Sequence, residues 1–214
     1  MRNRRTTKTK SKELLRLETF SDGVFAIAIT LLILELVQML HYHNNLPLFR
    51  MLLHNWKSFL AFLIGFLTIL ICWINHHLVV SYIERTDSKL FWVNGFVLMV
   101  VTFTPFPTAI LAEYMEKESH HALALFGFNY IMMSVAAYCI SAYILKRLAK
   151  KSGSDLLYYH TFLYKYSIFY TVITFFICFV SVPIAIFFYF LMFIVFAFPR
   201  EFSMMLLNRK NKQR

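Results

Sequence analysis

Five runs of apolar residues, separated by short polar segments, constrain the fold more than any other feature of this chain. A helix needs about 20 such residues to cross a hydrocarbon core ~30 Å thick. The chain is 59% hydrophobic, whereas an ordinary soluble domain is about 45–50% apolar. The runs lie at about Leu17–Leu40, Trp56–Tyr82, Leu90–Ala112, Ala122–Leu145 and Tyr158–Phe198. Each of the first four predicts one membrane-spanning helix, which excludes a soluble domain.

The fifth run is too long for one span. A single helix over its 41 residues, of which only His160 and Lys165 are ionisable, would extend about 60 Å, twice the hydrocarbon core. Proline cannot continue the helical hydrogen bonds, so Pro183 marks the break. We predict one helix over about His160–Val182 and a sixth from Pro183 onward. The sixth either ends near Pro199 or kinks there and continues to Leu207.

The distribution of positive charge predicts the orientation. With six spans, 19 of the 22 lysines and arginines lie on the side of the N-terminus, and only Arg50, Lys57 and Lys117 lie opposite. Cytoplasmic loops carry such an excess, so both termini are expected in the cytoplasm of a cell-membrane protein. We expect a basic segment (1–16), a six-helix domain (17–207) and a basic tail (208–214). The net charge of +11 then indicates contact with anionic lipids, not with nucleic acid.

Enzyme and metal chemistry find little support in the sequence. The three cysteines lie in separate apolar runs without CxxC spacing and are interpreted as small buried residues. The paired histidines fall in polar loops, where histidine is usually solvated. Those pairs are His41/His43 and His120/His121, with Glu113, Glu116 and Glu118 as the only nearby carboxylates. We expect no enzyme, no cofactor and no resident metal.

Asp22 is the most informative polar residue of the first helix. A carboxylate in the middle of a membrane helix costs ~2.5–3.5 kcal/mol, so it normally faces a partner or water. Asp22 lies only about 7–8 Å beyond the expected helix start at Leu17. It could therefore also be merely interfacial, and depth alone leaves both interpretations open.

The residues around Asp22 carry a resemblance. Arg16–Asp22 reads RLETFSD and matches the RxxxFSD signature of the transmembrane-protein-175 family of potassium channels. The continuation through Leu36 is also similar to that family's first helix. A looser likeness extends to Trp73–His77, to Asn94 and to Pro105–Pro107. A single FSD sequence is present, as in the prokaryotic members with one six-helix repeat.

This resemblance implies a potassium-permeable cation channel that conducts passively across the cell membrane. The implied assembly is a homotetramer whose first helices surround a central pore without a separate reentrant pore loop. The implied partners are other copies of the chain, membrane lipids, K⁺ and other monovalent cations. The chain lacks the TVGYG sequence of conventional potassium channels, so selectivity from a carbonyl cage is not expected.

The resemblance also indicates which face of the first helix lines the pore. In this family the residue five positions after the motif aspartate forms a hydrophobic constriction, which here is Ile27. A helix turns about 100° per residue, which places Asp22 about 140° away from Ile27. Thr30 lies about 60° to one side and either offers its hydroxyl to ions or bonds back to the helix backbone. The residues within about 40° of Ile27 are Gly23, Leu31, Leu34 and Gln38.

Rings of these aliphatic side chains would form a hydrophobic gate, because a narrow apolar bore empties of water and an ion cannot cross it unhydrated. Glu35, near the outer end, either concentrates cations or reaches the interface. We expect Asp22 to face neighbouring helices and accept hydrogen bonds there. The motif and packing network is predicted to comprise Arg16, Phe20, Ser21, Asp22, Trp73, His76, His77 and Asn94, with one of the two histidines taking part.

A secondary transporter for a cation or small solute is the alternative. Pro105 and Pro107 interrupt the third run, and broken helices mark binding sites in transporters. No matching interruption occurs in a second, inverted half, and a proline kink near the outer end explains the same residues.

Overall fold

A computed structural model describes residues 12–42, 47–115, 117–149 and 154–212. The described residues are helical apart from short connections and one isolated bridge between Ile83 and Ala149. The α-helices are α1 (Lys12–Tyr42), α2 (Leu48–His54), α3 (Trp56–Val80), α4 (Ser88–Phe103), α5 (Pro105–Tyr114), α6 (Ser119–Tyr143), α7 (Ser154–Ile177), α8 (Val182–Ala197) and α9 (Pro199–Lys212), and the π-helical turn η1 (Ile144–Leu148) follows α6.

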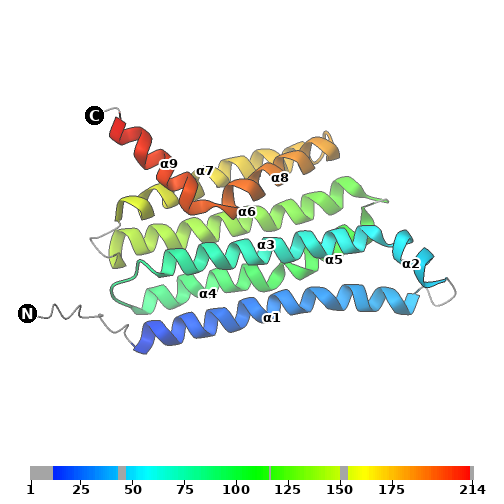
Figure 1. Ribbon diagram of the computed structural model, residues 1–214, viewed down its shortest axis with the longest axis horizontal. Helices are drawn as coiled ribbons and strands as arrows, with labels where there is room; N and C mark the ends of the chain where they lie inside the picture. Colours follow the sequence, from blue (N-terminus) through cyan, green and yellow to red (C-terminus); the bar gives the residue numbers. More distant parts are fainter. Residues whose placement is uncertain (1–11, 43–46, 116, 150–153, 213–214) are drawn as a thin grey trace, which may run out of the picture.

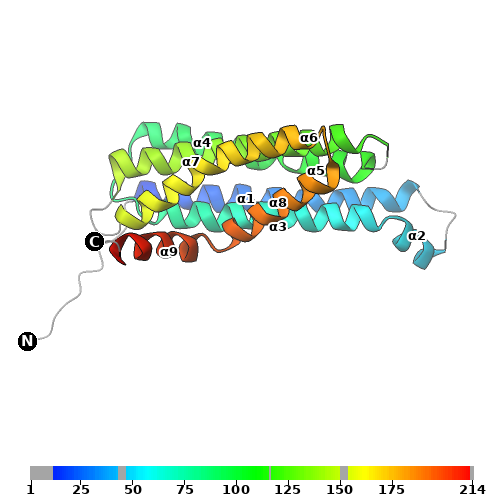
Figure 2. The ribbon, with the colours of Figure 1, turned by 90° about the horizontal axis from the view of Figure 1, so that it is seen from above.

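The helices form an elongated bundle in which α1 lies along one edge (Figure 1). Seen from above, α4, α6 and α7 form one layer, while α1, α3 and α8 form the other (Figure 2). The start of α1, the α3–α4 connection, the end of α6 and the end of α9 share one end of the bundle (Figure 1). Those are the segments in which the sequence concentrates its positive charge.

Four stretches are long and apolar enough to cross a membrane: Lys12–Leu34, Trp56–Val80, Ser88–Tyr114 and Ser119–Leu148. The bent pair α8 and α9 could form a fifth. The first four coincide with the first four apolar runs, which confirms an all-helical membrane protein. The span predicted over about His160–Val182, which corresponds to α7, stays a prediction.

The predicted starts and connections need correction at the N-terminal end. The first helix begins at Lys12 and not at Leu17, since the residues between them, which include the buried Leu14, continue the helix. Its early turn is held by Thr86, which donates a hydrogen bond to the Glu13 carboxylate at 2.6 Å. The seven-residue helix α2 was not predicted, because its apolar residues are too few for a span.

The third run is broken at Thr104, where Pro105 begins a new helix. Proline lacks the N–H that would continue α4. The buried Thr104 stabilises the break by donating to the carbonyl of Val100 and accepting from the Asn129 amide. The predicted interruption is therefore real, and it divides the run into α4 and α5.

The long fifth run is also divided, slightly earlier than predicted. Helix α7 ends at Ile177 and not at Val182, and α8 begins at Val182. The bend between α8 and α9 measures 81°. The chain therefore kinks at Pro199 and continues to Lys212, which decides between the two alternatives left open by the sequence and extends the last helix beyond Leu207.

Gly65 lets three helices approach closely. A Cβ atom at this position of α3 would lie 2.9 Å from Thr108 Cγ2 on α5 and 3.0 Å from Leu32 Cδ2 on α1. We expect Gly65→Ala to lower the free energy of unfolding by about 1–3 kcal/mol through overpacking. Thermal unfolding in detergent measures this. Adding Thr108→Ser removes the nearest methyl group and should restore much of the loss; no restoration would contradict the proposed cause.

Asp87 connects the start of α4 to the end of α6. One carboxylate oxygen accepts from the Leu90 amide at 2.9 Å, as a helix N-cap, and the other accepts from the Tyr143 hydroxyl at 2.5 Å. The hydrogen bond from Tyr143, followed by that from Leu90, holds the pKa of Asp87 below its ordinary value despite some desolvation. The negative charge is therefore favoured in the folded protein.

The Asp87 contacts predict a pH dependence. A carboxyl group whose pKa is lowered by folding stabilises the folded state fully at pH values above its ordinary pKa. This stabilisation is lost as the pH falls from the ordinary pKa through the lower, folded-state pKa. Asp87→Ala should cost about 1 kcal/mol near neutral pH, and its difference from the wild type should shrink in acid. Unfolding midpoints between neutral and acidic pH test this. Tyr143→Phe raises the folded-state pKa of Asp87, so its acid loss should be smaller and complete at a higher pH, and an unchanged profile would contradict the assignment.

Candidate functional site on helix α1

Helix α1 has one buried and one exposed face. The buried residues recur at intervals of three and four, which is the spacing of one helix face. They are Leu14, Leu17, Ser21, Phe25, Ala28 and Leu32. This stripe packs against α3, α4 and α5. The other face of α1 is left uncovered along the edge of the bundle (Figure 1).

Five of the six residues predicted to line a pore lie on the exposed face: Gly23, Ile27, Thr30, Leu31 and Leu34. Ile27 is 60% exposed and Leu34 is 50% exposed. The Thr30 hydroxyl donates to the Ile27 carbonyl at 2.9 Å, which is the back-bonded arrangement. Gln38 and Glu35 belong to α1, but their side chains lie outside the described part of the structure.

A buried hydrogen-bonded cluster ties α1 to α3 and α4. The amide of Asn94 on α4 donates to Ser21 Oγ at 3.0 Å, and its oxygen lies 2.7 Å from His76 Nε2 on α3. Ser21 in turn donates to the Leu17 carbonyl at 2.8 Å. All three polar residues of the cluster are at most 6% exposed. Since the amide oxygen can only accept, the His76 ring donates from Nε2.

Asp22 makes a separate contact. The indole Nε1 of Trp73 donates to Asp22 Oδ1 at 2.8 Å. Asp22 and His77 are exposed, and the His77 ring lies 6.0 Å from the Trp73 ring, centroid to centroid. The network therefore has two parts: Asp22 with Trp73 at the surface, and Ser21, Asn94 and His76 inside. Ser21, Asn94 and His76 therefore form a cluster of their own and are not the hydrogen-bond partners of the Asp22 carboxylate that the sequence predicted.

The remaining motif residues face outward. Arg16 and Phe20 are exposed and line a shallow groove between α1 and α4. The same groove reaches Asn94, so Arg16 lies at the margin of the buried cluster rather than inside it. Phe20 is 66% exposed and Phe91, across the groove, is 44% exposed.

Two residues of a second polar cluster were missed by the sequence analysis. The amide of Asn75 donates to the Ile71 carbonyl and to the Phe196 carbonyl at the end of α8, and its oxygen accepts from the Tyr164 hydroxyl at 2.8 Å. The last carbonyls of a helix lack partners within it, so Asn75 caps α8 from α3. The only signal for Asn75 in the sequence was its position directly before His76, in the segment that loosely resembles the family.

Three of the histidines predicted in loops lie in helices instead: His41 in the last turn of α1, and His120 and His121 in the first turn of α6. His120 contacts the Cys178 carbonyl through Nδ1 at 2.7 Å, so its side chain is fixed to the bundle and not simply solvated. His43 lies outside the described residues. Cys178 is buried as predicted and Cys72 is half-buried, whereas Cys139 is exposed, since its position on α6 points away from the protomer core.

The arrangement combines a fixed inner face with an apolar outer face. The Ser21–Asn94–His76 cluster sets the position of α1 relative to α3 and α4 through fully enclosed hydrogen bonds, which are costly to break in a low-dielectric interior. The outer face offers branched aliphatic side chains at heights separated by about one helical turn. Such a surface can pack against lipid or another protomer, or border a narrow apolar bore.

Sequence comparison places this region in a known family. The family described as "Endosomal/lysosomal potassium channel TMEM175" matches residues 16–105. A potassium channel of Chamaesiphon minutus is 54% identical over 101 residues, covering 47% of this chain and 50% of that protein. A potassium channel of Streptomyces collinus is 46% identical over 123 residues, covering 56% and 59%. The match thus spans about half the length of these curated relatives.

Comparison of the fold extends the likeness beyond α1–α4. The crystal structure of a lysosomal potassium-selective channel TMEM175 homolog from Chamaesiphon minutus matches with a TM-score of 0.76 and 34% sequence identity. The match covers 89% of this chain and 99% of that chain. The resemblance that the sequence carries in RLETFSD is therefore confirmed over most of the fold, and the chain belongs to the TMEM175 family.

Proposed function

We propose that this protein is a potassium-permeable cation channel of the cell membrane, with a pore lined by α1 from four copies of the chain. Its relatives from Chamaesiphon minutus and Streptomyces collinus are named potassium channels, and the matched crystal structure is that of a potassium-selective channel. Passive conduction of K⁺ by an ion channel, not catalysis, is the function that fits this family.

The exposed apolar face of α1 is the observation that carries the proposal. A single edge helix cannot enclose a conduit, so several copies have to meet around a common axis. The exposed positions of Ile27, Leu31 and Leu34 are compatible with such a meeting. In a symmetric assembly these side chains would form stacked apolar rings that stop ions by dewetting and conduct after a modest widening.

Exposed tryptophans at the two ends of the bundle support its placement across the membrane. Trp92 near the start of α4 is 83% exposed, and Trp56 at the start of α3 is 55% exposed. These two helices start at opposite ends of the bundle (Figure 1). Tryptophan is enriched at both membrane interfaces. We infer six spans with both termini in the cytoplasm, because the positively charged segments gather at one end.

Single-channel recording tests the function directly. Purified protein in planar bilayers under a K⁺/Na⁺ gradient should give discrete, ohmic currents whose reversal potential lies toward that of K⁺. Empty bilayers and heat-denatured protein serve as controls. Bilayers that contain verified, folded protein and carry no current would contradict the proposal.

A transporter remains the second candidate because α4 and α5 are interrupted at Thr104 within one run. Helices broken near the middle of the membrane commonly hold transported substrates. Flux into proteoliposomes distinguishes the two: uptake that saturates and requires a counter-ion gradient favours a transporter, whereas flux that follows the electrochemical gradient of K⁺ favours the channel.

A further inference from the structure

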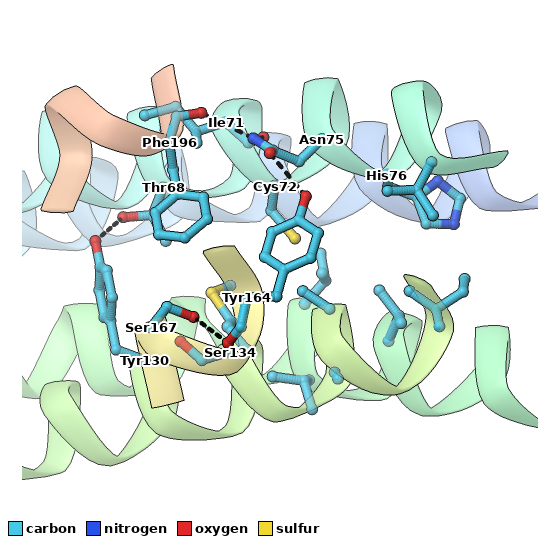
Figure 3. Close-up of a pocket in the computed structure, with 18 of the residues that line it drawn as sticks. Thr68, Ile71, Cys72, Asn75, His76, Tyr130, Ser134, Tyr164, Ser167 and Phe196 are labelled. Atoms are coloured by element: carbon cyan, nitrogen blue, oxygen red, sulfur yellow. Dashed lines mark hydrogen bonds between the residues drawn. The ribbon is translucent and has the colours of Figure 1, made fainter. Parts of the chain in front are cut away.

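A partly open cavity of about 90 Å³ lies between the helices of the bundle, away from α1. Its wall is formed by α3, α4, α6, α7 and α8 (Figure 3). Residues that face it from different helices include Cys72, Val101, Ala137, Ser167 and Phe193. The proposed ion pathway does not use this space, and the family assignment leaves it unexplained.

Two tyrosines hold the walls of the cavity apart. The Tyr130 hydroxyl on α6 lies 2.8 Å from Thr68 Oγ1 on α3, and the Tyr164 hydroxyl on α7 donates to Asn75 on α3 (Figure 3). Between them α6 contributes three short side chains, Ser134, Ala136 and Ala137. Long side chains bonded across the gap and short ones between them leave a space, where ordinary packing would leave almost none.

Three of the polar side chains of the wall are already engaged. Thr68 donates to the Ile64 carbonyl, Ser167 donates to the Tyr164 carbonyl, and both N–H groups of Asn75 go to backbone carbonyls. A buried water needs two to four polar partners, whereas apolar cavities stay dry. The cavity therefore offers carbon surface and little that would hold water.

We propose that this cavity is a binding site for a small, uncharged, apolar molecule. Dry cavities of about 150 Å³ with apolar walls bind benzene or xenon, and a 90 Å³ cavity suits the smaller of these. His76 also lines the cavity and contacts Asn94, which bonds to Ser21 on α1. An occupant would thus touch a residue that positions the candidate pore helix.

Diffraction from crystals of the full-length protein under xenon pressure tests this site without depending on ion conduction. We expect xenon between α3 and α6 in the wild type and its loss in Ala137→Leu, which fills the space. Cys139→Leu, on the exposed side of the same helix, should keep xenon. Cys72→Met fills the cavity from α3, should likewise exclude xenon, and replaces Ala137→Leu if that protein does not fold.

The unfolding temperature gives an independent readout. Filling a dry cavity adds apolar contacts, so a folded Ala137→Leu protein should unfold at a higher temperature than the wild type. Absence of xenon from this cavity in the wild type, or xenon that persists in the filled variants, would overturn the proposal.

Discussion

Replacing Ile27 by asparagine is expected to increase the potassium current and to weaken the discrimination between K⁺ and Na⁺. The amide keeps water in a bore that the aliphatic side chain would empty, so the barrier to a hydrated ion falls. A barrier lowered by about 1.4 kcal/mol raises a rate about tenfold. We therefore expect an increase in unitary current or open probability of roughly that order, measured in bilayers with a K⁺/Na⁺ gradient.

Ile33→Asn is the matched control for this variant. Ile33 is the same residue type on the same helix and is 44% exposed, but it points about 120° away from Ile27. Its replacement should leave conductance and selectivity near the wild-type values. Unchanged single-channel behaviour in Ile27→Asn would remove Ile27 from the ion pathway, and equal effects of both variants would exclude a localised constriction.

Replacing Asn94 by alanine is expected to give the largest loss of stability among the polar contacts of α1. Both the Ser21 hydroxyl and the His76 ring would lose a partner inside the bundle. The Ser21 hydroxyl keeps its hydrogen bond to the Leu17 carbonyl, so the main cost is the buried His76 N–H left unpaired, about 1–3 kcal/mol. Thermal unfolding in detergent measures it, and any folded fraction should show an altered unitary conductance because α1 is less firmly placed.

Trp73→Phe provides the comparison. It removes the hydrogen bond to Asp22, whose carboxylate is exposed and can be solvated instead. Water partly replaces a lost contact at such a site, so the cost should be clearly smaller than that of Asn94→Ala. Equal or reversed losses would show that the buried cluster is not what fixes α1.

Hydrophobic run length predicted most of the fold. The first four runs became helices at nearly the expected places, because a membrane span is specified by apolar length more than by local propensity. The same reasoning missed α2, which is too short for a span. It also placed the start of α1 five residues late, since two leucines between charged residues do not extend an apolar run.

The candidate site was predictable only in part. The motif indicated Ser21, Asp22, Trp73, His76 and Asn94 as neighbours, yet their division into a buried and an exposed group depends on helix rotation. Because α1 carries apolar residues on every face, its rotation about the helix axis could not be predicted from the sequence. Asn75 and Tyr164 were missed because their partners lie 121 and 89 residues away along the chain.

Accessibility of Leu34 to a charged thiol reagent during current recording tests the central claim most directly. The experiment uses Leu34→Cys, with Ile33→Cys as control, in a protein whose three native cysteines are replaced. If α1 from several copies encloses the ion pathway, a reagent added at the outer side should alter the current through Leu34→Cys and leave that of Ile33→Cys unchanged. Current that is insensitive to a verified modification of Leu34→Cys would place the pathway elsewhere.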